Sequence, residues 1–325
     1  MNFLEEIART DFQNLLIKSK KTKIHLVINS GNKTTTVFLF QEGISLPFGV
    51  LRISTGMNNV EKEFSILKII TKEDEHFSKT IPHPYNLYSF GKQKIASFSF
   101  MRGDPMIPRV NKRSFVKDHF QRVRKWLVRL TNIPTPDFLI EESSSCDLSL
   151  RCDCVLENIK SSNHSLISTL EQIKSIEKLL KERSIPLVIN HNDLHWSNIF
   201  LIEDQIGIVD WEATASRWPV IEWFFFIFTY VEKFFSCNKQ VPEVRFKVMH
   251  EIFFNKNWLS ETALFETFKL LKDLSLDEKL IYKFYLLGIF DYAYRRFWYD
   301  RSMVNRATSL FKKEGNFFYE SIFAI

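Results

Sequence analysis

The sequence predicts an α+β fold of two lobes, in which a small antiparallel sheet precedes a mainly helical half. The first observation is that runs of β-branched and aromatic residues are concentrated in about the first hundred residues. The second is that apolar residues at helical spacing dominate the rest of the chain. The third is length, because 325 residues are enough for two lobes around a cleft. We expect the first lobe at residues 1–103 and the second at residues 104–325.

Strand and helix signals alternate along the first lobe. We expect an amphipathic helix within residues 1–20 and another at residues 57–72, which Asn58 or Asn59 could cap. Gly31 and Gly43 separate the first three expected strands, which favours an antiparallel meander. The expected strands are residues 23–30, 34–40, 48–54, 85–91 and 95–101.

The second lobe is expected to be built mainly from helices. Residues 114–130 predict an amphipathic helix with Ser114 as its N-cap and with Arg124 on a solvated, cationic face. Its expected apolar face consists of Phe115, Phe120, Val123, Leu127 and Leu130. Residues 223–230 are the most apolar run, but they are too short to span a bilayer, which predicts a buried helix.

The remaining elements of the second lobe are less regular. The polar, Ser-rich residues 142–165 predict a surface loop. Further helices are expected at residues 165–184, 243–257, 262–273 and 277–303. Short strands are expected at residues 185–190, 199–202 and 206–210.

Composition and charge are those of an ordinary globular protein, with 45% hydrophobic and 25% charged residues. The net charge of +6 favours a solvated surface, although a small positive excess could also assist binding of a phosphorylated ligand. Lysines and arginines are not interleaved with aromatic residues as in a nucleic-acid groove. Acidic residues interrupt the N-terminal segment, so we expect no signal peptide and a cytoplasmic protein.

The four cysteines predict neither a zinc site nor a disulfide. Cys146, Cys152 and Cys154 have the spacing C-x5-C-x-C, which matches no common zinc pattern, and Cys237 stands apart. Without a secretory signal, reduced thiols are expected.

The most informative stretch is HNDLHWSNIF at residues 191–200, followed by IGIVDWE at residues 206–212. Polar groups among apolar residues need partners, so this is a hydrogen-bond network, a metal site or a catalytic loop. Asp193, Asn198 and Asp210 would supply phosphoryl transfer with one base and two oxygen ligands for Mg²⁺. His191 and His195 have a zinc-like spacing, but that spacing needs a helix, and the flanking residues predict strands.

These two motifs resemble those of the aminoglycoside phosphotransferase and choline kinase family, small-molecule kinases with a protein-kinase-like fold. HNDLHWSN resembles the catalytic-loop pattern H-x-D-x-x-x-x-N, and IVDWE resembles the metal-binding segment I-D-[FW]-E. The resemblance implies ATP or GTP as phosphate donor, Asp193 as base, and Asn198 and Asp210 as Mg²⁺ ligands. It also implies that His191 supports the loop by hydrogen bonds, while Glu212 is either structural or close to the metal.

The resemblance extends to the first lobe. It implies that Arg52, in GVLRIS, contacts the nucleotide phosphates and pairs with a glutamate of the following helix. Glu63 fits that glutamate better than Glu61. The turn at residues 29–36, with Ser30 and Gly31, would cover the phosphates. Phe100 and Met101, in SFSFMRG, would hold the adenine, and Gly103 ends that segment.

The function implied is phosphoryl transfer to a hydroxyl of a small molecule, such as an amino alcohol, a sugar or an aminoglycoside-like compound. The alternatives are a catalytically inactive kinase-like binding protein and a protein kinase, although no APE segment is present. Residues 290–302 gather aromatic and acidic side chains that could hold an ammonium group, although three arginines make an ion-paired helix equally consistent. The acids and aromatics are Asp291, Tyr294, Trp298 and Asp300. The acceptor and the oligomeric state are left open.

Overall fold

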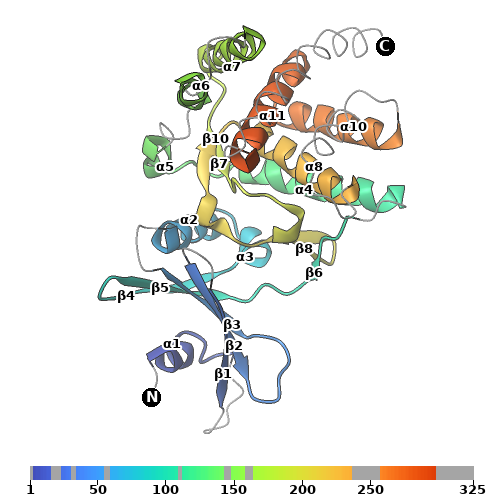
Figure 1. The fold of residues 1–325 in the computed structure, drawn as a ribbon. Coiled ribbons are helices and arrows are strands. Elements are labelled where there is room, and N and C mark those ends of the chain that lie inside the picture. Colours follow the sequence, from blue (N-terminus) through green and yellow to red (C-terminus); the bar gives the residue numbers. More distant parts are fainter. Residues whose placement is uncertain are drawn as a thin grey trace. The chain divides into compact units, whose positions relative to one another are not determined.

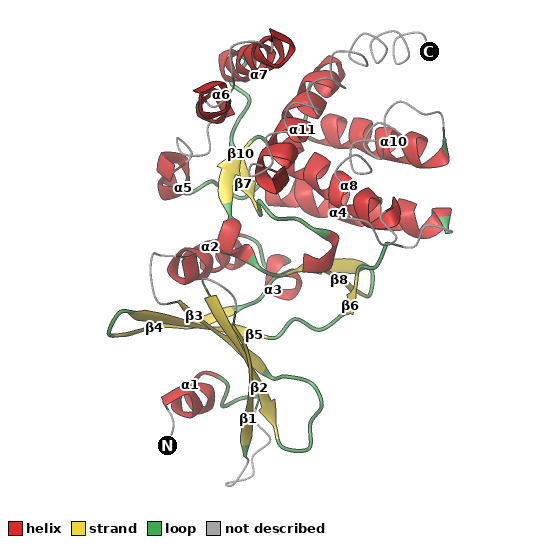
Figure 2. Ribbon diagram, viewed as in Figure 1, coloured by secondary structure: helices red, strands yellow, loops and turns green. Residues whose placement is uncertain are grey.

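The computed structural model describes residues 3–15, 23–30, 34–54, 59–108, 112–142, 148–157, 164–235 and 257–297. The chain divides into two compact units. Unit 1 contains Met1–Pro105 and Asn198–Thr214, and unit 2 contains Met106–Ser197 and Ala215–Ile325. The expected α+β class is confirmed, because unit 1 holds an antiparallel sheet and unit 2 is mainly helical (Figure 1, Figure 2).

The sheet of unit 1 has five antiparallel strands in the order β1-β2-β3-β5-β4. They are β1 (Ile24–Ser30), β2 (Thr34–Gln41), β3 (Gly49–Ser54), β4 (Pro84–Phe90) and β5 (Gln93–Ser99). All five strands were expected from the sequence. Because side chains alternate along a strand, Leu51 and Arg52 point to opposite faces of the sheet.

One helix covers each face of this sheet (Figure 1). On the face of Leu51, α1 (Phe3–Asp11) and the following Phe12 pack into a core with residues of β2, β3 and β5. Asp11 ties α1 to the sheet, because its Oδ1 accepts hydrogen bonds from Tyr88 Oη and Asn86 Nδ2, each 2.6 Å long. On the face of Arg52, α2 (Asn59–Glu73) contacts β3, β4 and β5.

A hairpin from late in the sequence completes unit 1. It consists of β8 (Ile199–Ile202) and β9 (Gln205–Ile208), and β8 also pairs with the short strand β6 (Asp104–Pro105). The 3₁₀ turn η3 (Trp211–Ala213) contacts α2, and the unexpected short helix α3 (Phe77–Thr80) contacts β9. Gly103 has φ +153°, and a Cβ there would lie 2.7 Å from Leu201 O, so only glycine permits this approach to β8.

Unit 2 is organised around α8 (Pro219–Phe235), which contains the apolar run that predicted a buried helix. Residues 219–231 are all buried, and α8 contacts α4, α10 and α11. The helices α4 (Arg113–Leu130), α5 (Asp137–Glu142), α6 (Leu148–Glu157), α7 (His164–Glu182), α10 (Trp258–Asp273) and α11 (Ile281–Phe297) accompany it. Across the described ranges, no helix combines the length and apolar character needed to cross a membrane.

The structure corrects the prediction of a loop at residues 142–165. Helix α6 lies within this stretch, with Leu148 and Cys152 buried one helical turn apart. The prediction was wrong because serine is common in turns, so the many serines favoured a loop. The segment is instead a helix that packs against α7. Cys154 belongs to the same helix, whereas Cys146 and Cys237 lie outside the described residues.

The structure also corrects three details of α4. The helix begins at Arg113 after Lys112, so Ser114 is not its N-cap, and Phe115 is exposed. Arg124 is buried rather than solvated, and its Nε donates a 2.8 Å hydrogen bond to Glu266 on α10. A buried cation is tolerated because it is paired.

The other expected helices fall partly outside the described residues. The helix expected at residues 277–303 is observed as the turn η4 (Glu278–Leu280) and α11, and residues 298–303 lie outside the description. The helix expected at residues 243–257 lies outside it as well, apart from Asn257, which caps α10.

Candidate active site

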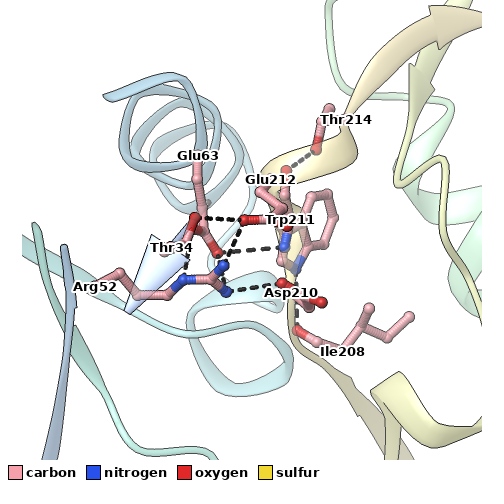
Figure 3. Close-up of polar contacts among 8 residues, drawn as sticks. All are labelled: Thr34, Arg52, Glu63, Ile208, Asp210, Trp211, Glu212 and Thr214. Carbon is pink, nitrogen blue, oxygen red and sulfur yellow. Dashed lines mark hydrogen bonds and ion pairs between the residues drawn. The ribbon is translucent and has the colours of Figure 1, made fainter. Parts of the chain in front are cut away.

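Arg52 lies at the centre of an ion-pair cluster in unit 1 (Figure 3). Its guanidinium contacts three carboxylates from two other segments of the chain. Nε lies 3.4 Å from Glu63 Oε2, Nη1 donates to Asp210 Oδ1 at 2.8 Å, and Nη2 lies 2.7 Å from Glu212 Oε2. Only 13% of the Arg52 side chain is exposed, so the planar fork is held in one orientation.

Glu63 is the buried member of this cluster. It projects from α2, and its Oε1 accepts the backbone N–H of Trp211 at 3.3 Å. Burial raises the pKa of the Glu63 carboxyl to about 7; Arg52 opposes this shift, and Asp210 and Glu212 reinforce it. Glu61, the other glutamate considered, lies 3.4 Å from Lys94 instead, so Glu63 is the partner of Arg52.

Arg52 is held in its charged form by the same cluster. Burial acts to lower the pKa of Arg52, but the three carboxylates outweigh it and the pKa is raised. Arg52 therefore stays protonated, and it is paired with three carboxylates rather than one. A cluster with this excess of negative charge is suited to receive further cations.

Asn198 and Asp210 lie at the same end of the β8–β9 hairpin. The backbone N–H of Val209 donates to Asn198 O at 3.0 Å, and the next pair in register is Ile199 with Ile208. Asp210 has φ +70° and ψ +60°, a left-handed conformation that turns the chain from β9 into η3. With 38% of its side chain exposed, Asp210 can reach an ion in solvent.

The turn that carries Asp210 is fixed by its neighbours. The indole N–H of the buried Trp211 donates to Ile208 O at 3.0 Å, and Thr214 Oγ1 donates to Trp211 O at 2.6 Å (Figure 3). Asp210 and Asn198 offer a carboxylate and an amide oxygen, the donors that Mg²⁺ prefers, so these residues fit a Mg²⁺ site.

Glu212 has a structural contact as well as its ion pair with Arg52. The hydroxyl of Thr34, at the start of β2, donates to Glu212 Oε2 at 3.0 Å. Ser30 ends β1, while Gly31 and Lys33 lie outside the described residues. The structure therefore leaves the expected phosphate-covering role of this turn as a prediction.

Phe100 and Met101 follow β5 in unit 1. The Phe100 ring meets Phe38 edge to face, with centroids 6.5 Å apart. Met101 is buried, and its Cε would lie 2.6 Å from a Cβ placed on Gly207 of β9. Their expected contact with adenine stays a prediction.

In unit 2, Asp193 lies on a loop that follows β7 (Val188–Asn190), which pairs with β10 (Ala215–Arg217). The backbone N–H of Asp193 lies 3.3 Å from Nδ1 of the buried His191, as expected for a histidine that supports the loop. Asp193 O in turn accepts the His195 N–H at 2.7 Å. Asp193 is half-buried, and the loop that carries it is held by these hydrogen bonds.

His191 and His195 lie in the strand–loop–strand setting from which the sequence argued against a zinc-like pair. The His195 ring Nδ1 lies 2.9 Å from Ser197 Oγ, and the two histidines lie on a loop rather than on one helix. Within the described segments, no three histidine, cysteine or acidic side chains are grouped as metal ligands.

Two residues that contact the Asp193 loop were not predicted from the sequence. Glu222, in the first turn of α8, accepts the backbone N–H of Asn192 at 2.5 Å and that of Leu194 at 3.0 Å. Arg295, on α11, donates from Nη1 to Asn192 O. Burial raises the pKa of Glu222, although Arg295 and the two backbone donors oppose the shift. The sequence signal for Glu222 was a single acid within the otherwise apolar run PVIEWFFF.

Asp291 does not have the role first considered for it. Its carboxylate is fully buried and contacts Arg151 at 2.7 Å as well as Arg217 and Arg295. Burial acts to raise the pKa of Asp291, but the three arginines outweigh it and the pKa is lowered. The ion-paired alternative therefore holds for Asp291, which is unavailable to an ammonium group. Tyr294 lies in α11, while Trp298 and Asp300 fall outside the described residues.

No protein-family model and no curated protein matches the sequence. Solved structures match its fold. Choline kinase from Cryptosporidium parvum Iowa II is 14% identical, with TM-score 0.57 over 98% of this chain and 96% of its own. Amicoumacin kinase in complex with AMP-PNP, Ca²⁺ and Ami is 11% identical, with TM-score 0.56 over 96% of both chains. A thermostable mutant of aminoglycoside phosphotransferase APH(4)-Ia, in complex with AMP-PNP and hygromycin B, is 12% identical, with TM-score 0.53 over 94% of this chain and 99% of its own.

These similarities confirm the fold expected from the sequence. The chain has the two-lobe, protein-kinase-like α+β fold found in choline kinase and in aminoglycoside phosphotransferase. Identities of 11–14% show the fold alone, so activity has to be argued from the residues.

Proposed function

We propose that the chain is a phosphotransferase that moves the γ-phosphate of ATP or GTP to a hydroxyl group of a small molecule. The observation that carries this proposal is the Arg52 cluster. A cation on a central strand is tied to Glu63 of a helix and to Asp210 of a neighbouring turn, with Asn198 beside that turn. Phosphoryl transfer needs such a cation close to oxygen ligands for a metal.

Asp193 serves as the base in this proposal. It accepts the proton of the acceptor hydroxyl, or orients that hydroxyl, while the oxygen attacks the γ-phosphate and the bond from the γ-phosphorus to the leaving nucleoside diphosphate breaks. The loop that carries Asp193 runs directly into Asn198 along the chain, so base and metal ligand are five residues apart. The bonds from His191 and Glu222 hold this loop in shape before a substrate arrives.

Asn198 and Asp210 are the proposed ligands of Mg²⁺. When bound, the ion neutralises charge on the phosphate oxygens. Arg52 contacts the same phosphates, and its ion pair with the buried Glu63 fixes the orientation of its guanidinium. Ser30 and Gly31 are proposed to cover the phosphates, and Phe100 and Met101 to hold the base of the nucleotide.

The acceptor is proposed to be an amino alcohol, a sugar or an aminoglycoside-like compound. Support comes from the similar solved structures, whose bound ligands include hygromycin B. The burial of Asp291 removes one carboxylate that a polycationic acceptor would have used. A catalytically inactive binding protein is the competing function, and Asp193, Asn198 and Asp210 all being present weighs against it.

The test is nucleotide consumption by the purified chain with Mg²⁺ and a panel of amino alcohols, hexoses, amino sugars and aminoglycosides. Asp193→Asn keeps the shape of the side chain but removes its basicity. We expect its turnover to fall on the order of 10²–10⁴-fold, with nucleotide affinity nearly unchanged. Asp118→Asn, at a half-buried acid of α4 that pairs with Arg122, is the matched control and should retain turnover. Equal turnover of Asp193→Asn and the parent would refute the assignment.

A further inference from the structure

The peptide bond between Asn192 and Asp193 is held at both ends. Arg295 Nη1 donates to its carbonyl oxygen, Asn192 O. Its N–H, on Asp193, lies 3.3 Å from His191 Nδ1. Because a peptide unit is planar, two such contacts fix the orientation of the whole plane and thereby the direction in which Asp193 leaves the backbone.

The neighbouring residue needs this support. Asn192 has φ +64°, in the left-handed region that a residue with a side chain rarely adopts. Such a conformation persists only when the surroundings determine it. Both backbone groups of Asn192 are therefore hydrogen-bonded to side chains. Its N–H donates to Glu222 of α8, and its carbonyl oxygen accepts from Arg295 of α11.

Arg295 is itself held in place from several sides. Its Nη2 pairs with Asp291, one turn earlier on α11, and its guanidinium carbon lies 4.7 Å from the centroid of the Phe225 ring. Asp291 is anchored in turn by Arg217 of β10 and Arg151 of α6. An arginine can serve two such partners because its donors form a rigid planar fork, whereas a lysine presents a single ammonium.

We propose that Arg295 is a positioning residue for Asp193. It holds the Asn192–Asp193 peptide plane so that the Asp193 carboxylate stays in the orientation needed for catalysis, and Asp291 orients Arg295 for this task. The inference rests on the proposed function, in which Asp193 is the base. It makes α11, the last described helix, part of the catalytic apparatus although Arg295 follows Asp193 by about a hundred residues.

The first test measures the loop without any substrate. Amide hydrogen exchange of Asn192, Asp193 and Leu194 is compared in the parent, Arg295→Met and Arg295→Lys. Loss of a hydrogen bond from a charged donor should speed exchange of these amides about tenfold or more in Arg295→Met, with a smaller change in Arg295→Lys.

Arg124→Met is the matched control for this measurement. Arg124 is also a buried arginine of unit 2 with an acidic partner, Glu266, but it pairs across α4 and α10. Its loss should lower stability while exchange at residues 192–194 stays at the parental rate. If Arg295→Met does not fold, Arg295→Lys carries the comparison.

The second test measures turnover. Misplacement of a catalytic group by about 1 Å can cost on the order of 10²-fold in rate, so kcat of Arg295→Met should fall by that order with KM for nucleotide little changed. Arg295→Lys should retain an intermediate kcat, and added guanidinium ion should partly restore turnover of Arg295→Ala.

The outcomes separate this inference from the proposed function. Parental exchange rates at residues 192–194 in the Arg295 variants, or equal acceleration in Arg124→Met, would overturn the positioning role. If the parent transferred phosphate to none of the acceptors, the proposed function would fail, and the exchange rates would still decide whether Arg295 fixes the loop.

Discussion

Each unit contains a charge cluster, and the two clusters have opposite composition. In unit 1, one cation, Arg52, is surrounded by Glu63, Asp210 and Glu212. In unit 2, one carboxylate, Asp291, is surrounded by Arg151, Arg217 and Arg295. Each cluster has three charges of one sign around one of the other, yet we assign them different tasks.

Solvent exposure is what separates the two clusters. In the acidic cluster, 38% of the Asp210 side chain and 32% of the Glu212 side chain are exposed, so an ion from solvent can balance the excess charge. In the arginine cluster, Asp291 is fully buried and Arg217 nearly so. The excess positive charge of the three arginines is offset by other groups of unit 2, namely the carboxylate of Glu222 and the carbonyl oxygen of Asn192. An open, unbalanced cluster is suited to binding, and a closed one to holding backbone in place.

Removing the central charge of the arginine cluster should have the largest effect. Asp291→Asn keeps the shape but leaves three arginines facing one another in a buried place, so we expect the free energy of unfolding to fall by about 3–5 kcal/mol. Asp210→Asn, the same substitution at an outer, partly exposed carboxylate of the open cluster, should alter it by less than about 1 kcal/mol, because that carboxylate is partly solvated. Urea unfolding measures both. Equal losses would mean that exposure does not distinguish the clusters.

Glu63 provides a test by pH. Its pKa of about 7 lies above the ordinary value of 4.5, so between these values the folded state holds a proton that the unfolded state has lost. The stability of the metal-free protein should therefore fall as pH rises from 4.5 to 7, by at most about 3 kcal/mol from this group, and level off above.

Two substitutions isolate this contribution. Glu63→Gln is neutral at every pH and should remove the decline, whereas Glu61→Gln, on the same helix but paired with Lys94, should keep it. Thermal unfolding across the pH range gives the measurement. A decline of the same size in Glu63→Gln would show that burial of Glu63 is not its source.

The smallest expected effect is the coupling between Arg52 and Glu63. If the two act as a unit, the loss in kcat/KM for the double variant Arg52→Ala, Glu63→Gln should fall short of the summed single losses by about 1–2 kcal/mol. Arg52→Lys should be partly active, because the charge remains while the planar fork is lost. Additive losses would mean that Arg52 and Glu63 do not act as a unit on the phosphates, and would leave the phosphates to another cation, such as Lys33.

The sequence was most informative where a local pattern carried the information. The five strands of the unit 1 sheet follow from runs of β-branched and aromatic residues between turns. The contact between Arg52 and Glu63 was implied by the family resemblance, and the structure shows this ion pair. The roles of Asp193, Asn198 and Asp210 stay predictions, although the hairpin sets Asn198 beside the turn of Asp210.

What the sequence missed depends on contacts between distant residues. Arg124 pairs with Glu266 and Arg295 bonds to Asn192, and partners more than a hundred positions apart leave no periodic signal. For Asp291 the sequence left two alternatives open for the same reason, because the partners Arg151 and Arg217 come from other elements. Helix α6 was missed because a serine-rich composition outweighed the spacing of Leu148 and Cys152.

The split composition of unit 1 has a consequence for synthesis on the ribosome. Its sheet is complete by residue 105, but the hairpin and turn that contact α2 and α3 come from Asn198–Thr214. At about 5–20 residues per second, roughly a hundred further residues take on the order of 5–20 s to emerge. During that interval the sides of α2 and α3 that the turn and hairpin will contact are uncovered, because residues 198–214 are made only after all of α4 to α7. A fragment ending at residue 105 would remain in that unfinished state, so the two units are distinct in space without being separable by a single cut in the chain.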